Sequence, residues 1–450
     1  MSELAVIEWP KISAARAAAF AALREVEKSD AHSDALLRAR KITRLSTQDR
    51  NLTTALVLDT LRWQLWLDDQ VRPLLKRPNS KLDLEVRIAL RLGALQILRM
   101  DRIPARAAID ESVELTKQSG HKFSAGMVNA VLRKLAARAA EGNTIDDSEA
   151  AVAAHPAWMT ARWERFYGAS DLHAICAHGQ TQAAATLRLV APDAESALSE
   201  AGIETAPGAL LTNTRRILAG DASSIVSDTT VRLQDEGSQL IAEIAGHGSS
   251  ILDCCAAPGG KTLILVERNP AARIVAQESS EARLGPLHKR LERAGAQVEC
   301  RLGDAAAFKG KAAYDVVLTD VPCSGTGTLG RNPEIRHRLS EADLARQSER
   351  QRAILAAALR AVKPGGRVVY STCSLEPEEN EQVVAAVLAE NANARISPIA
   401  ERIASLRTED VLTAEGAERL AASATPEGFL RLLPGALATD GFFVAVLTRS

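Results

Sequence analysis

The chain has 450 residues, of which 46% are hydrophobic and 25% are charged, so it is long enough for two to four domains of about 100–200 residues each. The N-terminal sequence has no basic, apolar leader, and no segment reaches the roughly 18 apolar residues that a membrane span needs. The six cysteines form no C-x-x-C pair and no zinc spacing, so we expect free thiols, no metal and a reducing cytoplasm.

The charge is distributed unevenly along the chain, although the net charge is only −1. Residues 1–140 hold 24 Lys and Arg against 16 Asp and Glu, while the other 310 residues hold 31 against 40. A basic front half suits a polyanionic partner, because cationic side chains near phosphates release counterions. A solvated helical surface would give the same numbers, so charge alone does not identify a nucleic acid.

The first 140 residues are predicted to be helical. Residues 14–26 are rich in alanine, and residues 49–68 carry apolar side chains at helical spacing. Residues 84–98 are apolar on more than one side, which is typical of the central helix of a bundle. Residues 105–119 and 123–137 continue the pattern. We therefore expect an all-α bundle over residues 1–140.

A second, smaller region is predicted over residues 155–232, after a polar linker at 139–154. Residues 156–167 combine tryptophan and arginine at helical spacing, a pattern that serves either amphipathic packing or stacking on bases. Residues 186–190 and 223–233 are typical of strand and loop. This region is predicted to be a small α+β module.

From Gly248 onward, short apolar runs alternate with helical segments. The predicted strands are 251–253, 274–277, 298–302, 316–319, 367–371 and 442–447, with helices over 340–362 and 378–389 between some of them. Such alternation indicates a doubly wound, mostly parallel sheet. Residues 233–450 are therefore predicted to form a Rossmann-like α/β domain.

A glycine-rich turn, D-C-C-A-A-P-G-G-K-T, follows the first of these strands. Gly259 and Gly260 let the backbone approach a ligand closely, and the next helix offers free N–H groups. A P-loop would need glycine at position 255, which is Cys255, and the G-x-G-x-x-G pattern is also absent. Acids follow the next three strands, at Glu278, Asp304 and Asp320. Together these features favour a nucleoside cofactor, S-adenosylmethionine in particular.

Two cysteines follow neighbouring predicted strands. Cys323 lies in D-V-P-C after Asp320, and Cys373 lies in S-T-C-S. Carbon 5 of cytosine is too weak a nucleophile to accept a methyl group until a thiolate adds to carbon 6. An acid such as Asp320 at the ring N3 would help that addition. This pair of thiols beside a methyl donor therefore indicates cytosine C5 methylation.

The motifs resemble those of the RsmB (Sun/Fmu) family of bacterial 16S rRNA cytosine-5 methyltransferases. The resemblance rests on C-A-A-P-G-G-K at 255–261, D-x-P-C at 320–323 and T-C-S-x-x-P-x-E-N at 372–380. Residues 11–140 are similar to the helical NusB-like RNA-binding domain. Glu278 departs from the family pattern, because aspartate is usual there.

The resemblance implies an S-adenosylmethionine-dependent class I methyltransferase domain that acts on a flipped cytosine. Cys373 would be the nucleophile, Cys323 would assist product release, and Asp320 would contact both base and donor. The implied donor-binding residues are Cys255, Ala256, Ala257, Pro258, Gly259, Gly260, Lys261, Glu278, Arg283, Asp304 and Asp320.

The expected partner is RNA, either 16S rRNA or an early 30S assembly intermediate, and the enzyme is expected to be a monomer. The basic residues around His337 are interpreted as an RNA-facing segment. Two alternatives stay open: the same chemistry on tRNA or 23S rRNA, and a non-catalytic RNA-binding factor for ribosome assembly.

Overall fold

The computed structural model describes residues 9–142, 146–308, 310, 312–437 and 439–450. The first eight residues of the predicted 1–140 bundle thus lie outside the described part. By contacts, the chain divides into two units. The first contains the chain up to Gln182 together with Leu329–Arg338, and the second contains Ala183–Thr328 together with Leu339–Ser450.

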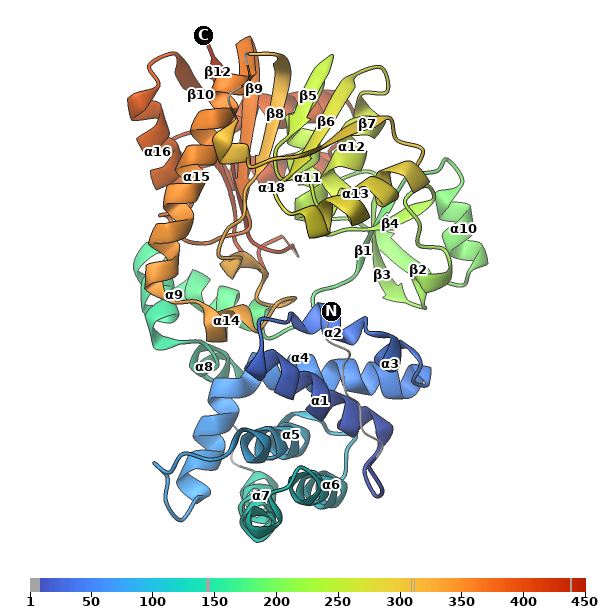
Figure 1. The fold of residues 1–450 in the computed structure, drawn as a ribbon, viewed down its shortest axis with the longest axis vertical. Coiled ribbons are helices and arrows are strands. Elements are labelled where there is room, and N and C mark those ends of the chain that lie inside the picture. Colours follow the sequence, from blue (N-terminus) through green and yellow to red (C-terminus); the bar gives the residue numbers. More distant parts are fainter. Residues whose placement is uncertain (1–8, 143–145, 309, 311, 438) are drawn as a thin grey trace. The chain divides into compact units, whose positions relative to one another are not determined.

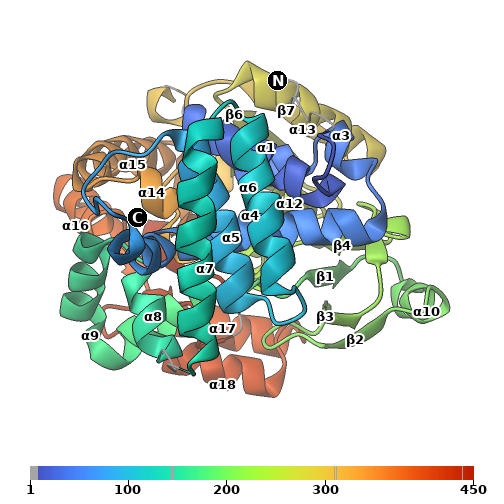
Figure 2. The same cartoon turned by 90° about the horizontal axis from the view of Figure 1, so that it is seen from below.

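The first unit is helical throughout its regular structure. Its helices are α1 (Ala14–Lys28), α2 (Ser33–Leu37), α3 (Arg40–Thr43), α4 (Thr47–Val71), α5 (Leu84–Arg99), α6 (Ala105–Gln118), α7 (Ala125–Ala140), α8 (Asp147–Ala153), α9 (Ala157–Gly179) and α14 (Ile335–Arg338), with short 3₁₀ turns at Arg72–Leu74 and Lys122–Ser124. Figure 2 looks onto α5, α6 and α7. None of the described helices is both long and apolar enough to cross a membrane.

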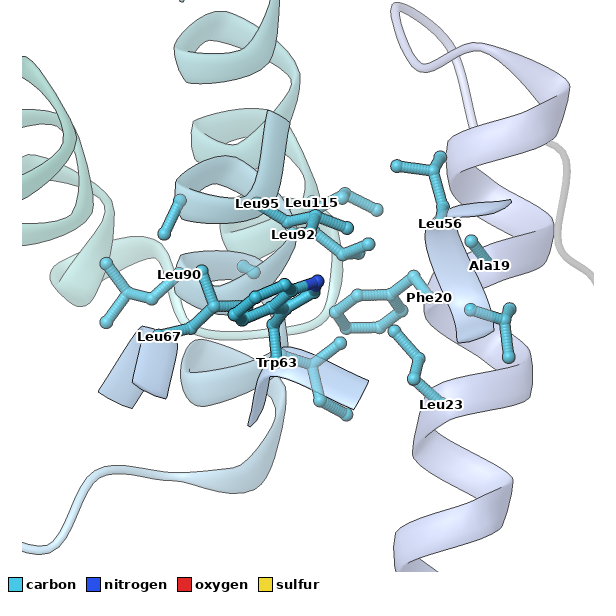
Figure 3. Packing of buried hydrophobic residues seen from close by; sticks show 14 of the residues in the cluster. Ala19, Phe20, Leu23, Leu56, Trp63, Leu67, Leu90, Leu92, Leu95 and Leu115 are labelled. Atoms are coloured by element: carbon cyan, nitrogen blue, oxygen red, sulfur yellow. The ribbon is translucent and has the colours of Figure 1, made fainter. Parts of the chain in front are cut away.

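The core of this unit is built from apolar faces of α1, α4, α5, α6 and α7. Phe20 of α1 and Trp63 of α4 both belong to this core (Figure 3), and they are 1% and 5% exposed. The guanidinium of Arg99 lies 4.0 Å from the Trp63 ring centre, a cation–π geometry. Residues 84–98 are apolar on more than one side because α5 contacts α1, α4, α6 and α7.

The basic residues around His337 were expected to face RNA, and this expectation is wrong for Arg336. Arg336 is 1% exposed. It donates to the carbonyl oxygens of Gly179 at 2.9 Å and Arg62 at 3.0 Å, while Nε2 of His337 lies 2.8 Å from the carbonyl oxygen of Leu61. A run of basic residues normally predicts an exposed segment. Here the carbonyl oxygens at the C-terminal ends of α8 and α9 accept from Arg336, so its charge can be buried.

The second unit contains two sheets. Its strands are β1 (Thr186–Leu189), β2 (Glu204–Pro207), β3 (Thr214–Ala219), β4 (Val231–Leu233), β5 (Ser250–Asp253), β6 (Arg273–Glu278), β7 (Val298–Leu302), β8 (Tyr314–Asp320), β9 (Val362–Thr372), β10 (Ala394–Ser397), β11 (Leu430–Leu432) and β12 (Phe442–Arg449). Its helices are α10 (Ala194–Glu200), α11 (Glu236–Ala245), α12 (Gly260–Arg268), α13 (Glu281–Arg293), α15 (Glu341–Ala361), α16 (Glu381–Glu390), α17 (Ile399–Thr408) and α18 (Ala414–Ala422), with 3₁₀ turns at Ala222–Ser224, Ala305–Ala307 and Thr326–Thr328.

The smaller sheet has the order β2-β3-β1-β4 and is antiparallel. Buried ion pairs join it to the helices of the larger sheet. Arg188 of β1 contacts Glu243 of α11 at 2.8 Å and Glu267 of α12 at 2.7 Å, and Arg232 of β4 contacts Glu267 at 2.6 Å. These multiple bonds compensate for burying the charges.

The larger sheet has the order β10-β12-β9-β8-β5-β6-β7, with β11 paired to β12 (Figure 1). The strands from β9 to β7 run parallel, and β12 is antiparallel to β9. Ile251, Val316 and Leu318 pack on the face covered by α11, α12 and α17. Leu252 and Val317 point to the opposite face, against α15 and α16. The predicted fold class, a helical N-terminal region followed by an α/β sheet domain, is confirmed.

Candidate active site

The two thiols come together at the carboxyl edge of the larger sheet. Strands β8 and β9 are parallel neighbours with Asp320 opposite Ser371, so the loops that follow them share one edge, as expected from the sequence. The sulfur atoms of Cys323 and Cys373 lie 3.4 Å apart. Both cysteines are free thiols.

Gly327 fixes how closely these loops approach. Its N–H donates to the carbonyl oxygen of Cys373 at 2.9 Å, and its own carbonyl accepts from Gly441 at 2.8 Å. A Cβ atom at this position would lie 2.5 Å from the Gly441 carbonyl oxygen and 2.9 Å from that of Cys373. Only glycine can pass between the two segments without moving them.

The glycine-rich turn lies at the end of β5, beside β8. Gly259 is the N-cap of α12 and has a φ of 97°, a left-handed conformation that suits glycine. The turn and neighbouring groups enclose a cavity of about 130 Å³. Its lining includes Cys255, Ala256, Ala257, Pro258, Gly260, Lys261, Asp320, Asp253, Gln234, Ser238, Leu233 and Arg290. Six of the predicted turn residues and Asp320 therefore line one cavity.

Lys261 connects this turn to the end of β8. Its ammonium lies 2.7 Å from Oδ2 of Asp320, and Oδ1 of Asp320 accepts from the hydroxyl of Ser371 at 2.9 Å. Burial lowers the pKa of Lys261, but Asp320, and then Cys373 and Asp253, outweigh it, so the net shift is upward. Lys261 therefore keeps its charge beside both the carboxylate and a thiol.

Sequence reasoning did not single out Asp253 as a site residue. Its side chain is 1% exposed and accepts from the hydroxyl of Thr262 at 2.7 Å. Burial raises its pKa to about 6, assisted by the nearby charge of Asp320 and opposed by Thr262. The only signal in the sequence was its position as the last residue of a strand.

The other predicted donor contacts, Glu278, Arg283 and Asp304, are not among the residues that line this cavity. Glu278 is buried at the end of β6 and accepts from the N–H of Ser280 at 2.9 Å. Arg283 donates to the carbonyl oxygen of Ala257 at 2.7 Å and lies 3.7 Å from Oε2 of Glu278. Asp304 is exposed after β7, where it accepts from the N–H of Ala306.

The thiols differ in their surroundings. The hydrogen bond with Cys373 and burial raise the pKa of Cys323 well above its ordinary value, with a further contribution from Glu379. Burial likewise raises the pKa of Cys254 and Cys255, and raises that of Cys176 to about 12. Because the thiolate is the reactive form, these last three are unreactive at neutral pH. Within the part of the chain that the structure describes, no group of three His, Cys, Asp or Glu residues could hold a metal ion.

The N-terminal and the C-terminal parts of the chain each match a known protein family. The family described as 16S rRNA methyltransferase RsmB/F matches residues 244–448, and the NusB family matches residues 13–137. A Bacillus subtilis protein named probable ribosomal RNA small subunit methyltransferase B is 31% identical, over 98% of this chain and 99% of its own. A Synechocystis protein of the same name is 31% identical over 97% and 99%.

Solved structures agree on the fold. The crystal structure of PH0851 covers 98% of this chain and 100% of its own, with a TM-score of 0.76 and 23% identity. A methyltransferase homologue from Pyrococcus horikoshii covers 65% of this chain and 95% of its own, with a TM-score of 0.52 and 23% identity.

The cofactor is S-adenosylmethionine, and the residues around the cavity fit it. A Cβ atom on Gly260 would lie 3.1 Å from Oε1 of Gln234, so the glycine keeps the cradle open. Among the described residues, that buried oxygen has no hydrogen-bond partner, which leaves an acceptor for a ligand N–H or O–H. On its motifs, its fold and its full-length relatives, the chain belongs to the 16S rRNA methyltransferase RsmB/F family.

Proposed function

We propose that this protein transfers a methyl group to carbon 5 of a cytosine in 16S rRNA through a covalent bond between Cys373 and the base. The observation that carries the proposal is the 3.4 Å separation of the Cys323 and Cys373 sulfur atoms at the strand ends. Two thiols in contact, beside an acid and a lysine that line the donor cavity, are what this chemistry requires and what transfer to an amino group does not.

In the first step, the thiolate of Cys373 forms a bond to carbon 6 of the ring. The carbon 5–carbon 6 π electrons then shift to carbon 5 and the N3 side of the ring. We assign to Asp320 and Lys261, which lie 2.7 Å apart, the role of holding a proton or hydrogen bond at N3 and the ring carbonyl. Bound S-adenosylmethionine would supply the electrophilic methyl group that carbon 5 accepts, with S-adenosylhomocysteine as the leaving group.

In the second step, a base removes the proton from carbon 5, the double bond forms again, and the Cys373 sulfur leaves. We assign this base to Cys323. Its raised pKa keeps it a thiol in the free enzyme, and the first cause of that shift is its hydrogen bond with Cys373. Once Cys373 is bonded to carbon, that hydrogen bond and the Cys373 charge no longer raise the pKa of Cys323, which favours loss of its proton and a role as the base.

The other parts of the chain would bind the RNA. We assign RNA binding to the helical residues 1–140, RNA positioning to residues 155–232, and methyl transfer to residues 233–450. The Bacillus subtilis relative is named for ribosomal RNA of the small subunit, and we extend that substrate to this protein. The target cytosine would be flipped out of its stack to reach the partly buried thiols. We propose that the enzyme acts as a monomer, in the cytoplasm, on 16S rRNA or an early 30S assembly intermediate.

The test is transfer of labelled methyl from S-adenosylmethionine to unmodified 16S rRNA, with identification of the modified base. Wild type should yield 5-methylcytosine and Cys373→Ala should yield none, while both bind the donor equally. Cys300→Ala is the matched control, because Cys300 lies on β7 and not at the end of β8 or β9.

Three outcomes would change the proposal. Activity in Cys373→Ala would exclude this nucleophile. Label on tRNA or 23S rRNA, but not on 16S rRNA, would keep the chemistry and replace the substrate. RNA binding without donor binding would indicate an assembly factor and overturn catalysis.

A further inference from the structure

One buried carboxylate connects the residues that follow the two cysteines. Ser324 comes directly after Cys323, and Ser374 directly after Cys373. Oε1 of Glu379 accepts from the backbone N–H of Ser324 at 2.8 Å, and Oε2 accepts from the hydroxyls of both Ser324 and Ser374. The two hydroxyl oxygens lie 3.0 Å from each other.

Glu379 is 0% exposed, so its charge has been removed from water. Burying a carboxylate is costly unless donors surround it. Here a third side chain contributes: Nε2 of Gln351 donates to Oε1 of Glu379 at 3.0 Å and to the carbonyl oxygen of Pro322 at 2.9 Å. A neutral residue of the same size would fill the same space, so packing alone does not explain why a carboxylate is buried at this position.

The neighbouring residue holds the same loop from its other side. Oδ1 of Asn380 accepts from the hydroxyl of Thr372 at 2.5 Å, and its amide donates to the carbonyl oxygen of Ser374 at 2.9 Å. The hydroxyl of Tyr370 donates to the backbone carbonyl of Glu379 at 2.5 Å. These bonds fix Glu379 relative to β9, so its carboxylate is a rigid bridge from β9 to the Cys323 loop.

The same carboxylate acts on the thiols electrostatically. After the Cys373 hydrogen bond, burial and the Cys373 charge, Glu379 is the next group that raises the pKa of Cys323. A negative charge near a thiol disfavours loss of its proton. Cys323 therefore remains able to donate its S–H to the sulfur of Cys373.

We propose that Glu379 is a positioning residue for methyl transfer, and that its carboxylate, bound to Ser324 and Ser374, sets the separation of the two cysteines. The proposal rests on the covalent mechanism above. Glu379 itself does not touch the base. It keeps the sulfur atoms of Cys373 and Cys323 at a fixed distance while the cytosine enters and leaves the site.

The experiment compares Glu379→Gln with Glu379→Asp and with Glu381→Gln. Glutamine keeps the size and removes the charge, whereas aspartate keeps the charge on a shorter arm. Glu381 is the matched control, because it lies two residues further on and pairs with Arg431 instead of with either cysteine loop. Methyl transfer to 16S rRNA is measured from pH 6 to 10, together with donor affinity and the rate of covalent adduct formation on RNA that carries 5-fluorocytosine.

We expect Glu379→Gln to lower kcat at least about tenfold, as for loss of an organising contact, with donor affinity and the KM for RNA changed less than about twofold. Wild-type activity should fall at high pH, when Cys323 loses its proton in the free enzyme. In Glu379→Gln this fall should begin at lower pH, because removing the charge lowers the pKa of Cys323. Glu379→Asp should keep the wild-type position of that fall, and Glu381→Gln should behave as wild type.

A wild-type rate and pH profile in Glu379→Gln would overturn the proposal. If this variant does not fold, as judged by lost donor binding, Ser324→Ala, Ser374→Ala and the double variant replace it. Losses that simply add would overturn the bridge, whereas a double variant no worse than either single one supports it. Failure of wild type to make 5-methylcytosine or to form an adduct would instead refute the proposed function.

Discussion

The ammonium of Lys261 lies 2.7 Å from the carboxylate of Asp320 at the carboxyl end of β8. The opposite end of the same strand carries a pair of the same kind, Lys363 and Asp315, also at 2.7 Å. The first pair lines the donor cavity beside the thiols, and the second ties the strand to Ser249 and Ser250. Comparing variants of the two pairs therefore distinguishes the loss of a salt bridge on β8 from the loss of a salt bridge at the active site.

Replacing Asp320 with asparagine should lower kcat by about 100-fold or more, a typical contribution of a group that holds a proton in the transition state. The reason is that asparagine can neither balance the positive charge of Lys261 nor stabilise a proton at the ring N3. Steady-state methyl transfer to 16S rRNA measures the loss. Asp315→Asn is the control and should retain wild-type kcat, and equal losses in both variants would argue against a catalytic role for Asp320.

Removing Cys323 should separate bond formation from release. Cys323→Ala keeps the proposed nucleophile but lacks the base that completes the reaction, so enzyme and RNA should remain covalently joined. A denaturing gel would then reveal a band of lower mobility that contains both protein and labelled RNA. The double variant with Cys373→Ala should give no such band. A freely turning-over Cys323→Ala enzyme would exclude the assigned role in release.

Much of this site was predictable because its signals are local. Each buried strand has a short apolar run, and the parallel order brings β8 and β9 together. Cys323 and Cys373 could therefore be assigned to one edge from the sequence alone. The turn at 255–261 was equally readable, because its two glycines and lysine occupy adjacent positions.

The remaining features depend on contacts between distant parts of the chain. Arg336 is basic in sequence, but its burial depends on carbonyl groups of residues 62 and 179. Glu379 acts through Ser324, 55 residues away. The pKa of Asp253 depends on its burial under surrounding residues. No periodicity or motif encodes such long-range relationships, so sequence reasoning missed them.

Asp253 should make the stability of the protein depend on pH. Burial raises its pKa from 3.8 to about 6 in the folded state. The unfolded chain therefore loses this proton at lower pH than the folded protein does, and stability falls as pH rises from about 4 to above 6. The shift corresponds to about 3 kcal/mol at neutral pH. Asp253→Asn should thus unfold at higher temperature than wild type at pH 7.5 and at nearly the same temperature at pH 4. A gap in melting temperature of equal size at both pH values would contradict the shift.

Arg336 should be essential to the stability of the helical unit. Its guanidinium satisfies the carbonyl oxygens of Arg62 and Gly179 and reaches that of Ala154 at 3.3 Å. Burial lowers its pKa, so the charge is held at a cost, but removing it takes this donor away from the carbonyl oxygens of Gly179 and Ala154. The carbonyl of Arg62 keeps a donor in Nε2 of Gln180 at 3.1 Å. We expect Arg336→Met to destabilise this unit by about 3 kcal/mol, seen as faster amide hydrogen exchange at the C-terminal end of α9. Arg106→Met is the control, because the Arg106 side chain is 92% exposed and its only ion pair in the described chain is with Asp110 at 3.6 Å. Exchange as slow in Arg336→Met as in this control would mean that water replaces the guanidinium at little cost.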